Sequence, residues 1–428
     1  MAQWNQSCDV LVVGSGAGGM MAAYTAAREG LDVILVESTD RFGGMSAYSG
    51  GGMWLPGNAV LRRAGDDDTM DQARTYYRAV VGDRTPRALQ DAFLDTGAKV
   101  VDYLERDEHF QFEVLPWPDY YGMAPQASPT GRHIIPSPLP TEELGGLLDI
   151  LRPNLKVERR GEPVGEQLEG GQSLIGRFLQ TLNSADNVTM LRSTELTSLV
   201  REGDRVTGAE LTSPQGPVRI EARRGIILAA GGFERNAGMR AANHVPGTVA
   251  GTMAPPGNTG GAITAGIAIG ADVDLMDQAW WSPGLMQPDG TETFTLGFSG
   301  GIFVNDKGER FMDESVAYDR AGRRIIELVE SGQLTLPFWY VYDNAGDGVP
   351  PIFWPNVPFA PTADYQVAGV WRSADTLAGL AQKIDVPADA LEASVARFNG
   401  HCANDKDTDF QRGDEPYERI VVYGASPL

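Results

Sequence analysis

Residues 10–38, VLVVGSGAGGMMAAYTAAREGLDVILVES, have the pattern of a buried strand, a glycine turn, a helix and a second strand. Gly14, Gly16 and Gly19 give the turn the spacing G-x-G-x-x-G. Glu37 follows 18 residues later, at the end of the second strand. In such a unit the helix N-terminus binds a pyrophosphate, and the acid accepts a hydrogen bond from a ribose hydroxyl. The pattern therefore predicts a Rossmann-like unit that binds a dinucleotide. The neighbouring residues expected to contact the cofactor are Ser15, Ala17, Gly18 and Ser38.

The turn alone does not separate NAD from FAD, because both dinucleotides bind to this motif. Two later glycine clusters favour FAD: RFGG at residues 41–44 and ILAAGGF at residues 227–233. A flavin dinucleotide is long and needs close approach of the backbone at several places, which glycine and alanine permit. The contacts predicted from these clusters are Gly43, Gly44, Ala230 and Gly231. The sequence therefore predicts FAD, with simple tight turns as the alternative explanation of the two clusters.

The order of the segments predicts an α/β protein. Residues 70–107 have helical periodicity, and a second helix is predicted at 387–399. Residues 188–233 alternate as short strands with turns between them, which indicates a β-meander that returns to the parallel sheet. Residues 112–140 are rich in Pro, Tyr and Gly, which predicts an ordered loop rather than regular structure.

From about residue 277 aromatic side chains become frequent among Gly and Pro. We therefore expect two domains. Residues 1–276 would form the FAD-binding domain, with its parallel sheet and β-meander. Residues 277–428 would form an α+β domain that binds the substrate.

Composition narrows the class of partner. The formal net charge of −22 argues against nucleic acids and anionic membranes. Cys8 and Cys402 lie far apart in the sequence, which favours a reducing compartment over a disulfide framework. The four histidines lack the spacing of metal ligands, so no metal is predicted. The chain start has no pattern of a secretory signal, and no apolar run approaches the roughly 20 residues that span a bilayer. We expect a cytoplasmic location, with peripheral contact to a membrane as the alternative.

Seven motifs occur in chain order and carry a resemblance to a known family. They are SAYSGGGMWLPG, WPDYYG, GRFLQTL, AAGGFERN, NTGGAITAGIAIGA, LMDQAWWSPG and GERFMDESVAYDRAGR. Together with the glycine turn they resemble flavoproteins of the fumarate reductase and 3-ketosteroid dehydrogenase group. They are similar to the 3-ketosteroid Δ1-dehydrogenases in particular, and the similarity extends to FQRGDEPYE at residues 410–418. Fumarate reductases share the flavin half but not the two tyrosine motifs.

The resemblance implies FAD, removal of two hydrogens across C1–C2 of a 3-ketosteroid, and an external electron acceptor such as a quinone. It places Tyr120 and Tyr318 at the flavin ring, with Tyr318 as acceptor of the C2 proton and Tyr120 as its support. It implies further cofactor contacts at Ser46, Ser49, Gly50 and Leu196. It implies a steroid pocket with walls formed by Trp117, Phe294, Ile352 and Trp354.

These residue types suit the chemistry. A phenol with an ordinary pKa near ~10 is a poor base at neutral pH unless a hydrogen bond or a positive charge stabilises its anion. A second phenol can supply that hydrogen bond. A steroid requires a flat apolar slot with few polar groups. In the competing interpretation, each tyrosine is a packed aromatic with a satisfied hydroxyl, and each wall residue belongs to the core.

The sequence departs from the family pattern in two places. In relatives the chain does not stop at DEPYERIVVYGASPL but continues through GLYAAGN-like and YPGxG-like motifs, which provide the last strand, flavin contacts and the groups that bind the C3 carbonyl. The residues after Glu418 are also unlike the family. The absence of these motifs predicts weak FAD binding and poor turnover, since one lost oxyanion donor typically lowers a rate about 10²–10³-fold. Gly261 stands where relatives usually have Asp. The alternatives to a Δ1-dehydrogenase are a Δ4-(5α)-ketosteroid dehydrogenase, a flavin-binding fragment with little or no turnover and, last, a fumarate-type reductase.

Overall fold

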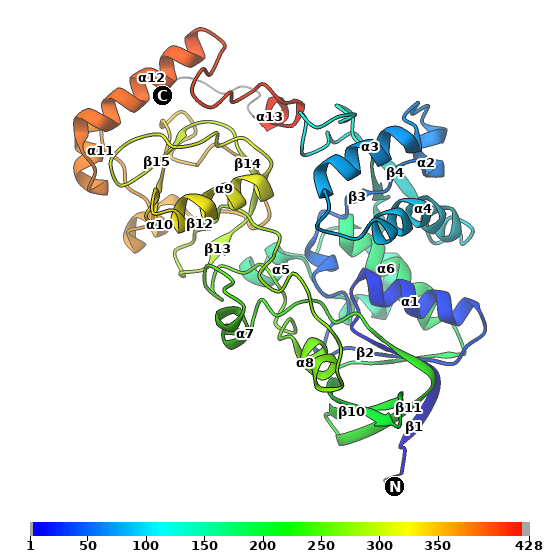
Figure 1. Ribbon diagram of the computed structural model, residues 1–428. Coiled ribbons are helices and arrows are strands. Elements are labelled where there is room, and N and C mark those ends of the chain that lie inside the picture. The colour runs from blue at the N-terminus through cyan, green and yellow to red at the C-terminus, as the bar shows by residue number, and fades with distance from the viewer. Residues whose placement is uncertain (1–2, 422–428) are drawn as a thin grey trace. The chain divides into compact units, whose positions relative to one another are not determined.

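The computed structural model describes residues 3–421, and its chain divides into two compact units (Figure 1). The first unit consists of Met1–Pro116 and Arg132–Gln278, and the second of Trp117–Gly131 and Ala279–Leu428. The loop at 117–131, which carries Tyr120, therefore belongs to the second unit although its neighbours in sequence belong to the first. The last residues of the chain, where the sequence differs from the family pattern, lie outside the described part from residue 422 on.

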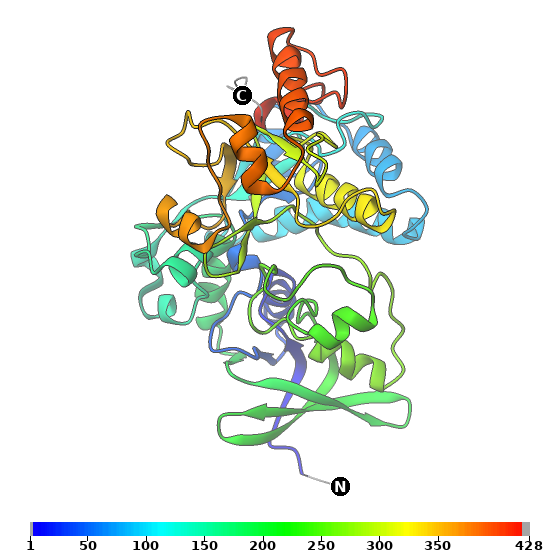
Figure 2. The same ribbon diagram turned by 90° about the vertical axis from the view of Figure 1, so that its left-hand side faces the viewer.

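A six-stranded sheet forms the centre of the first unit, in the order β8-β2-β1-β11-β10-β9. β8, β2, β1 and β11 run parallel to one another, whereas β10 pairs antiparallel with both β11 and β9. The bounds of the strands are β1 Gln6–Val13, β2 Val33–Val36, β8 Val188–Leu191, β9 Glu195–Glu202, β10 Arg205–Ser213 and β11 Gly216–Leu228. The predicted parallel sheet with a β-meander is thereby confirmed, and Figure 2 shows the meander as long green ribbons.

The registers of the parallel strands explain the apolar runs in the sequence. Leu11 of β1 lies opposite Ile34 of β2, and all four residues of β2 are buried. A strand that is covered on both faces has no solvent-facing positions, which is why VILV shows no alternation. The second half of β11, from Arg223 on, pairs with β1 and with no other described strand, and Ile227 and Leu228 are exposed.

Helices cover both faces of this sheet (Figure 1). α1 (Ala17–Arg28) and α6 (Gly170–Asn183) share one buried apolar cluster with β1 and β2. α8 (Gly261–Ala268) contributes alanines to a second cluster on the opposite face. The other helices of the unit are η1 Ser46–Tyr48, α2 Ala59–Arg63, α3 Met70–Val81, α4 Arg87–Leu104, η2 Thr141–Asp149, α5 Leu155–Arg160 and α7 Ala237–Ala242.

The prediction of a loop over residues 112–140 is wrong at both ends of that segment. Three short strands form a sheet in the order β3-β5-β4, and two more pair as β6 and β7. Their bounds are β3 Met53–Trp54, β4 Phe112–Leu115, β5 His133–Pro136, β6 Leu139–Pro140 and β7 Gln167–Leu168. The strands of each pair are distant in sequence, which gives no local signal of their pairing. The prolines and tyrosines between them dominate the composition of the segment, and the two short apolar runs, FEVL and HIIP, were not recognised as strands.

The part of the second unit that the structure describes consists of three two-stranded ribbons and five helices. The ribbons are β12–β13, β14–β17 and β15–β16, all antiparallel. The strands span Leu285–Met286 (β12), Glu292–Thr293 (β13), Thr295–Phe298 (β14), Ile302–Val304 (β15), Trp339–Val341 (β16) and Ile352–Pro355 (β17). The helices span Tyr318–Glu330 (α9), Thr362–Ala368 (α10), Leu377–Ile384 (α11), Ala388–Ala403 (α12) and Pro416–Val421 (α13).

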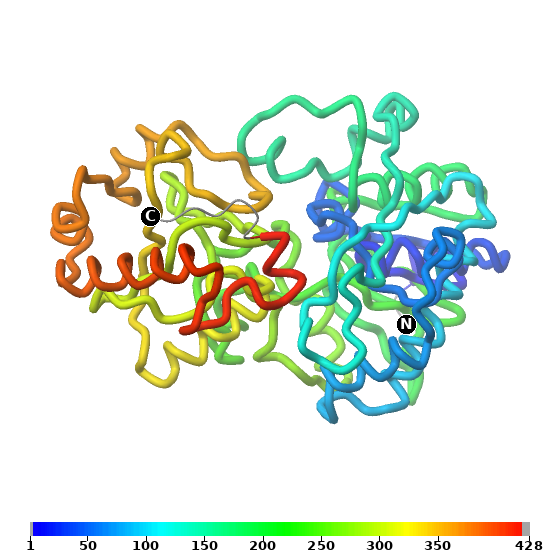
Figure 3. The backbone as a smooth tube through the Cα atoms, turned by 90° about the horizontal axis from the view of Figure 1, so that it is seen from above, coloured from blue at the N-terminus to red at the C-terminus, as the bar shows by residue number. Residues whose placement is uncertain are grey.

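Two apolar clusters hold these elements together. β15 and β16 pack against α11 and α12, whose hairpin appears in orange and red in Figure 3. Phe303 of β15 packs on the other side, against α9. Tyr318 is the first residue of α9, and the buried apolar side of this helix fixes its position. No helix among the described residues is long and apolar enough to cross a membrane.

Candidate functional site

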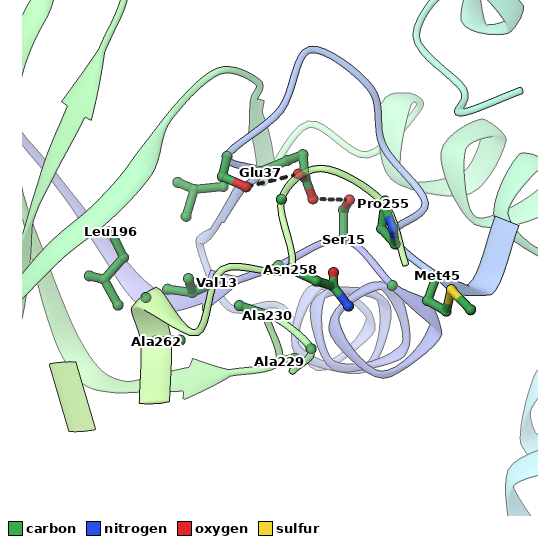
Figure 4. A pocket seen from close by; sticks show the side chains of 18 of the residues that line it. Val13, Ser15, Glu37, Met45, Leu196, Ala229, Ala230, Pro255, Asn258 and Ala262 are labelled. Atoms are coloured by element: carbon green, nitrogen blue, oxygen red, sulfur yellow. Dashed lines mark hydrogen bonds between the residues drawn. The ribbon is translucent and has the colours of Figure 1, made fainter. Parts of the chain in front are cut away.

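A cavity in the first unit lies where the parallel strands end. Val13 and Val36, the last residues of β1 and β2, line it together with the start of α1. This is the edge at which open parallel sheets bind their ligands. Figure 4 shows Leu196 and Ala262 at one end of the cavity and Met45 at the other, with Asn258 between them.

Twelve residues named as cofactor contacts line this cavity. They are Gly14, Ser15, Gly16, Ala17, Gly18, Glu37, Ser38, Gly44, Ser46, Leu196, Ala230 and Gly231. Gly43 lies directly behind the lining, because its N–H donates to Ser15 Oγ at 3.0 Å. Gly19, Ser49 and Gly50 are not part of the lining: Gly19 packs against the Gly14 carbonyl, and Ser49 donates to Ser46 O at 2.7 Å.

The turn before α1 leaves room for an anion. Gly14 has φ +99°, and a Cβ there would lie 2.4 Å from Ala229 O, so only glycine fits between the strands. Gly16 is the N-cap of α1, and no side chain there accepts from the helix. The first turn of α1 also contains no acidic residue. The amide group of Ala17 donates to Ser46 Oγ at 2.9 Å. The other amide groups of the first turn and the helix dipole are left for a pyrophosphate in the cavity.

Glu37 is held by hydroxyl and amide donors at the end of β2. Its side chain is 7% exposed, and it accepts from Ser15 Oγ at 2.5 Å and from Thr39 N at 2.9 Å. Thr39 Oγ1 donates to the same carboxylate at 2.8 Å. Figure 4 shows the hydrogen bond between Ser15 and Glu37. These donors orient the carboxylate, and its remaining acceptor position on Oε2 is available to a ribose hydroxyl in the cavity.

Arg152 is a lining residue that the sequence analysis missed. Its side chain is 4% exposed, its Nη2 donates to Thr39 Oγ1 at 2.6 Å, and its guanidinium lies 5.7 Å from the centre of the Tyr48 ring. Through Thr39 it supports Glu37 and supplies positive charge next to the anion site. It follows η2 in a segment with no motif, so only the fold brings it to the cavity. Asn258, another lining residue that was not predicted, lies in the quoted motif NTGGAITAGIAIGA and could have been found there.

The second unit brings Tyr120 and Tyr318 together, although 198 residues separate them in the sequence. Their rings meet edge to face with centroids 5.6 Å apart, and their hydroxyl groups are hydrogen-bonded. Phe294 packs edge-on against Tyr318 at 4.8 Å, and Tyr417 packs edge-on against Tyr120 at 5.2 Å. The two phenols therefore share one apolar environment.

Burial is the main influence on both phenols. It raises the pKa of Tyr318 well above its ordinary value, and the neighbouring Tyr120, Tyr417 and Asp319 raise it further. Burial also raises the pKa of Tyr120, but hydrogen bonds from Tyr318 and Trp117 oppose that shift. A single negative charge on the pair is therefore best placed between the two oxygens, where a second phenol and an indole N–H can stabilise it.

An aromatic wall lies next to this pair. The indole rings of Trp117 and Trp354 are stacked, with their centroids 6.3 Å apart. The ring of Phe353 also stacks on Trp117, at 6.1 Å. Trp354 is 62% exposed and has φ +47°, so its large apolar face is presented to solvent from a strained backbone. Ile352 differs from the other predicted wall residues, because it packs against the core cluster of the second unit.

Trp280 is a second residue that the sequence analysis did not assign to the site. Its ring stacks on Tyr318 at 6.0 Å with an interplanar angle of 25°, and its side chain is 73% exposed. An exposed indole against a buried phenol leaves a flat apolar surface open to a ligand. The aromatic-rich motif LMDQAWWSPG contains this residue, but nothing in the motif distinguishes it from Trp281.

One cluster of potential metal ligands lies away from these residues. His401, Asp407 and Asp409 bring one ligand atom each within 4.8 Å of one another. Asp409 already forms an ion pair with Arg397, and Asp407 forms one with Arg310 at 2.8 Å. Arginine neutralises both carboxylates, so this cluster has the chemistry of a structural ion-pair network rather than of a metal site.

The comparisons with known proteins agree with this geometry. The FAD binding domain family matches residues 9–427. A 3-oxosteroid 1-dehydrogenase of Mycobacterium tuberculosis is 36% identical over 97% of this chain and 82% of its own length. One from Mycolicibacterium smegmatis is 34% identical over 97% of this chain and 81% of its length. The crystal structure of a 3-ketosteroid Δ1-dehydrogenase from Sterolibacterium denitrificans, in complex with 1,4-androstadiene-3,17-dione, matches with a TM-score of 0.85 at 28% identity, covering 99% of this chain and 86% of that one.

The cavity fits the cofactor of that family in three respects: a helix N-terminus with no acidic residue in its first turn, a buried acid at the strand end, and glycines where a Cβ would meet backbone. FAD is therefore the cofactor of the first unit. The chain belongs to the FAD-binding domain family of flavoproteins, among the 3-oxosteroid 1-dehydrogenases.

Proposed function

We propose that this chain is a FAD-dependent 3-ketosteroid Δ1-dehydrogenase, which removes one hydrogen each from C1 and C2 of the steroid A ring. The observation that carries the proposal is the hydrogen-bonded pair of half-buried phenols, Tyr120 and Tyr318, next to an apolar aromatic surface. Bound FAD supplies the hydride-accepting chemistry of the reaction. The remaining requirement is a base for the C2 proton, and the tyrosine pair supplies it.

The pair accepts the proton in the following way. The C3 carbonyl of the substrate acidifies the C–H bonds at C2. In its reactive form the pair has lost one proton, and the proton that remains lies between the two phenolic oxygens. The Tyr318 oxygen takes the C2 proton, and the two phenols share the negative charge before that transfer through the hydrogen bond between them. The pair returns to its reactive form by releasing the proton to solvent.

The apolar residues around the pair contribute by excluding water and by matching a flat ligand. Phe294 and Trp280 cover two sides of the Tyr318 ring. Trp117 and Trp354 form a separate stack in the same unit, and Tyr417 connects that stack to Tyr120. A substrate with four fused hydrocarbon rings buries this surface from water.

The proposal divides the work between two parts of the chain. The first unit, Met1–Pro116 and Arg132–Gln278, binds FAD. The second unit, Trp117–Gly131 and Ala279–Leu428, provides the substrate-binding residues and the base. Reduced cofactor has to be reoxidised after each turnover, and we assign that role to an external acceptor of the quinone class.

A product assay tests the proposal. Purified protein loaded with FAD is incubated with androst-4-ene-3,17-dione and an artificial electron acceptor, and separately with a 5α-reduced 3-ketosteroid. Formation of the 1,4-diene from the first substrate supports the proposal. Desaturation of the second substrate at C4–C5, with none of the first, would identify a Δ4-(5α)-dehydrogenase instead. No product from either substrate, in protein that retains FAD, would mean a flavin-binding protein without this activity.

A further inference from the structure

Arg320 connects the two segments that carry the tyrosine pair. It lies in the first turn of α9, two residues after Tyr318, on the helix that begins with that tyrosine. Its Nη1 donates to the backbone carbonyl of Tyr120 at 2.9 Å, and its guanidinium lies 5.3 Å from the centre of the Tyr121 ring. The Arg320 side chain therefore connects α9, which begins with Tyr318, to the backbone of Tyr120.

Glu415 fixes the other side of this contact. Its carboxylate accepts from both terminal nitrogens of Arg320, at 2.7 and 3.0 Å, in the two-pronged geometry that arginine and carboxylate prefer. Its Oε2 also accepts from Gly122 N at 2.9 Å. A Cβ on Gly122 would lie 3.0 Å from that same oxygen, so the loop approaches Glu415 as closely as glycine allows.

The carboxylate is itself held in place. Glu418 accepts from the backbone N–H of Glu415 at 3.1 Å and from that of Gly413 at 3.0 Å, which closes the turn before α13. The side chain of Glu415 is 10% exposed and that of Arg320 is 26% exposed. An ion pair that is this far removed from water and bound in two prongs is stronger than an ordinary surface pair.

The clamp adds polar contacts between the loop at 117–131 and α9 to the ring contact of Tyr120 with Tyr318. Within the loop, Asp119 and Ser128 bond to each other through backbone and side chain, at 3.1 and 2.9 Å. Those bonds close the loop on itself but do not connect it to Tyr318. A hydrogen bond between two hydroxyls tolerates only a narrow range of distance, about 2.5–3.0 Å. A loop that drifts by a fraction of an ångström would therefore separate the phenols.

We propose that Arg320 and Glu415 are positioning residues for the tyrosine pair: they clamp the Tyr120 backbone to the Tyr318 helix and so hold the two phenolic oxygens within hydrogen-bond distance. The consequence for catalysis rests on the proposed function. In this role both residues act through Tyr120.

Hydrogen–deuterium exchange tests the clamp without any need for turnover. The FAD-loaded variants Arg320→Met and Glu415→Gln are compared with Arg324→Met, which removes an exposed arginine one turn later on the same helix. We expect amide exchange in residues 119–127 to become at least several-fold faster in the first two variants and to stay at the wild-type rate in the control. Equal exchange of that segment in all three variants and in the wild-type protein would overturn the proposal.

A double-mutant cycle tests the route through Tyr120. With a 3-ketosteroid substrate, Arg320→Met should lower kcat about 10–100-fold with little change in KM, because misplacement of a catalytic group affects the chemical step. In a Tyr120→Phe background the same change should lower kcat by no more than about two-fold, since the group it positions is gone. Equal fold losses in both backgrounds would show that Arg320 acts on the rate in some other way and would contradict the proposal.

The two experiments separate the clamp from the proposed function. Loss of loop protection in Arg320→Met, in a wild-type protein that does not desaturate 3-ketosteroids, would leave the clamp standing and refute the function. Unchanged loop protection, in a wild-type protein that does form the 1,4-diene, would refute the clamp and leave the function standing.

Discussion

Gly14 and Gly16 lie two residues apart in one turn, but the structure requires them for different reasons. Gly14 has a positive φ, and a Cβ there would collide with the Ala229 carbonyl, so the fold itself needs glycine. Gly16 has φ −67°, and its built Cβ meets only Ser46 Oγ, at 3.5 Å. The protein alone therefore tolerates a side chain at Gly16. What that side chain would obstruct is the pyrophosphate position at the start of α1.

Gly16→Val should consequently abolish FAD binding and leave the protein folded. Gly146→Val is a matched control, because Gly146 is exposed and has open space around its Cβ position. We expect the control to purify with the wild-type ratio of flavin to protein and Gly16→Val to purify with less than about a tenth of it, as K_d rises by an order of magnitude or more. Both variants should give the circular dichroism of the folded protein. Full flavin content in Gly16→Val would rule out this position for the pyrophosphate.

At the scale of elements, a buried acid joins the strands of the second unit to the segment before α9. Glu314 has a fully buried side chain and receives Arg310 Nη2 at 2.8 Å and Arg412 Nη1 at 3.1 Å. It also accepts from the N–H of Phe303 in β15, at 3.0 Å. The segment that ends at Tyr318 is therefore anchored by a charge that has no access to water.

Glu314→Gln should lower the free energy of unfolding of this unit by about 3–5 kcal/mol, because it removes the buried carboxylate that pairs with Arg412 and leaves Arg310 with Asp407 alone. Glu327→Gln provides the contrast: Glu327 pairs with Arg324 on the surface of α9 and is 64% exposed, so its loss should cost less than about 1 kcal/mol. Urea titrations of both variants, followed by tryptophan fluorescence, measure the difference. Similar midpoints for the two variants would argue against a structural anchor at Glu314.

The sequence predicted the elements that are determined by neighbouring residues, but not those that depend on contacts between distant segments. The β1–α1–β2 unit is determined by local periodicity and three glycines, and its prediction from residues 10–38 was confirmed. The strands β4 and β5 depend on pairing across a long excursion and were predicted as a loop. Arg152 had no motif to mark it, since its role arises from the packing of η2 against the ribose-binding turn. The tyrosines came from the family resemblance, and their mutual hydrogen bond could not be read from either motif alone.

At the scale of the whole molecule, the proposed reaction gives the two units separate tasks that respond differently to pH. The groups around Tyr318 are aromatic or acidic: Tyr120, Tyr417 and Asp319 all raise its pKa, after burial, and Trp280 and Phe294 cover its ring. Since the base must lose a proton before it can take one, kcat should rise with pH from neutral into the alkaline range. The flavin content, which depends on the first unit, should not change over that range.

The free energy of unfolding should fall at high pH, in the opposite direction to the change in kcat. The pKa of Tyr318 in the folded protein lies above the value of about 10 for an unfolded chain. Its contribution to stability is therefore complete below about pH 10 and is lost as pH rises toward the folded pKa, because the unfolded chain gives up its proton first. Activity and urea midpoints measured together from pH 6 to 11 should give an alkaline activity optimum below the onset of unfolding. A kcat that falls steadily from pH 7 to pH 9 would contradict a phenol as the base.

Anaerobic mixing of the FAD-loaded protein with androst-4-ene-3,17-dione tests the central claim most directly, because it follows cofactor and product in a single turnover. In the wild-type protein the visible absorbance of the flavin should bleach while the steroid is converted to its 1,4-diene. Tyr318→Phe should bind the same amount of FAD and show neither change, whereas Tyr342→Phe, which removes a phenol bonded to Gly348 O elsewhere in the same unit, should behave as wild type. Bleaching and diene formation at the wild-type rate in Tyr318→Phe would contradict the account.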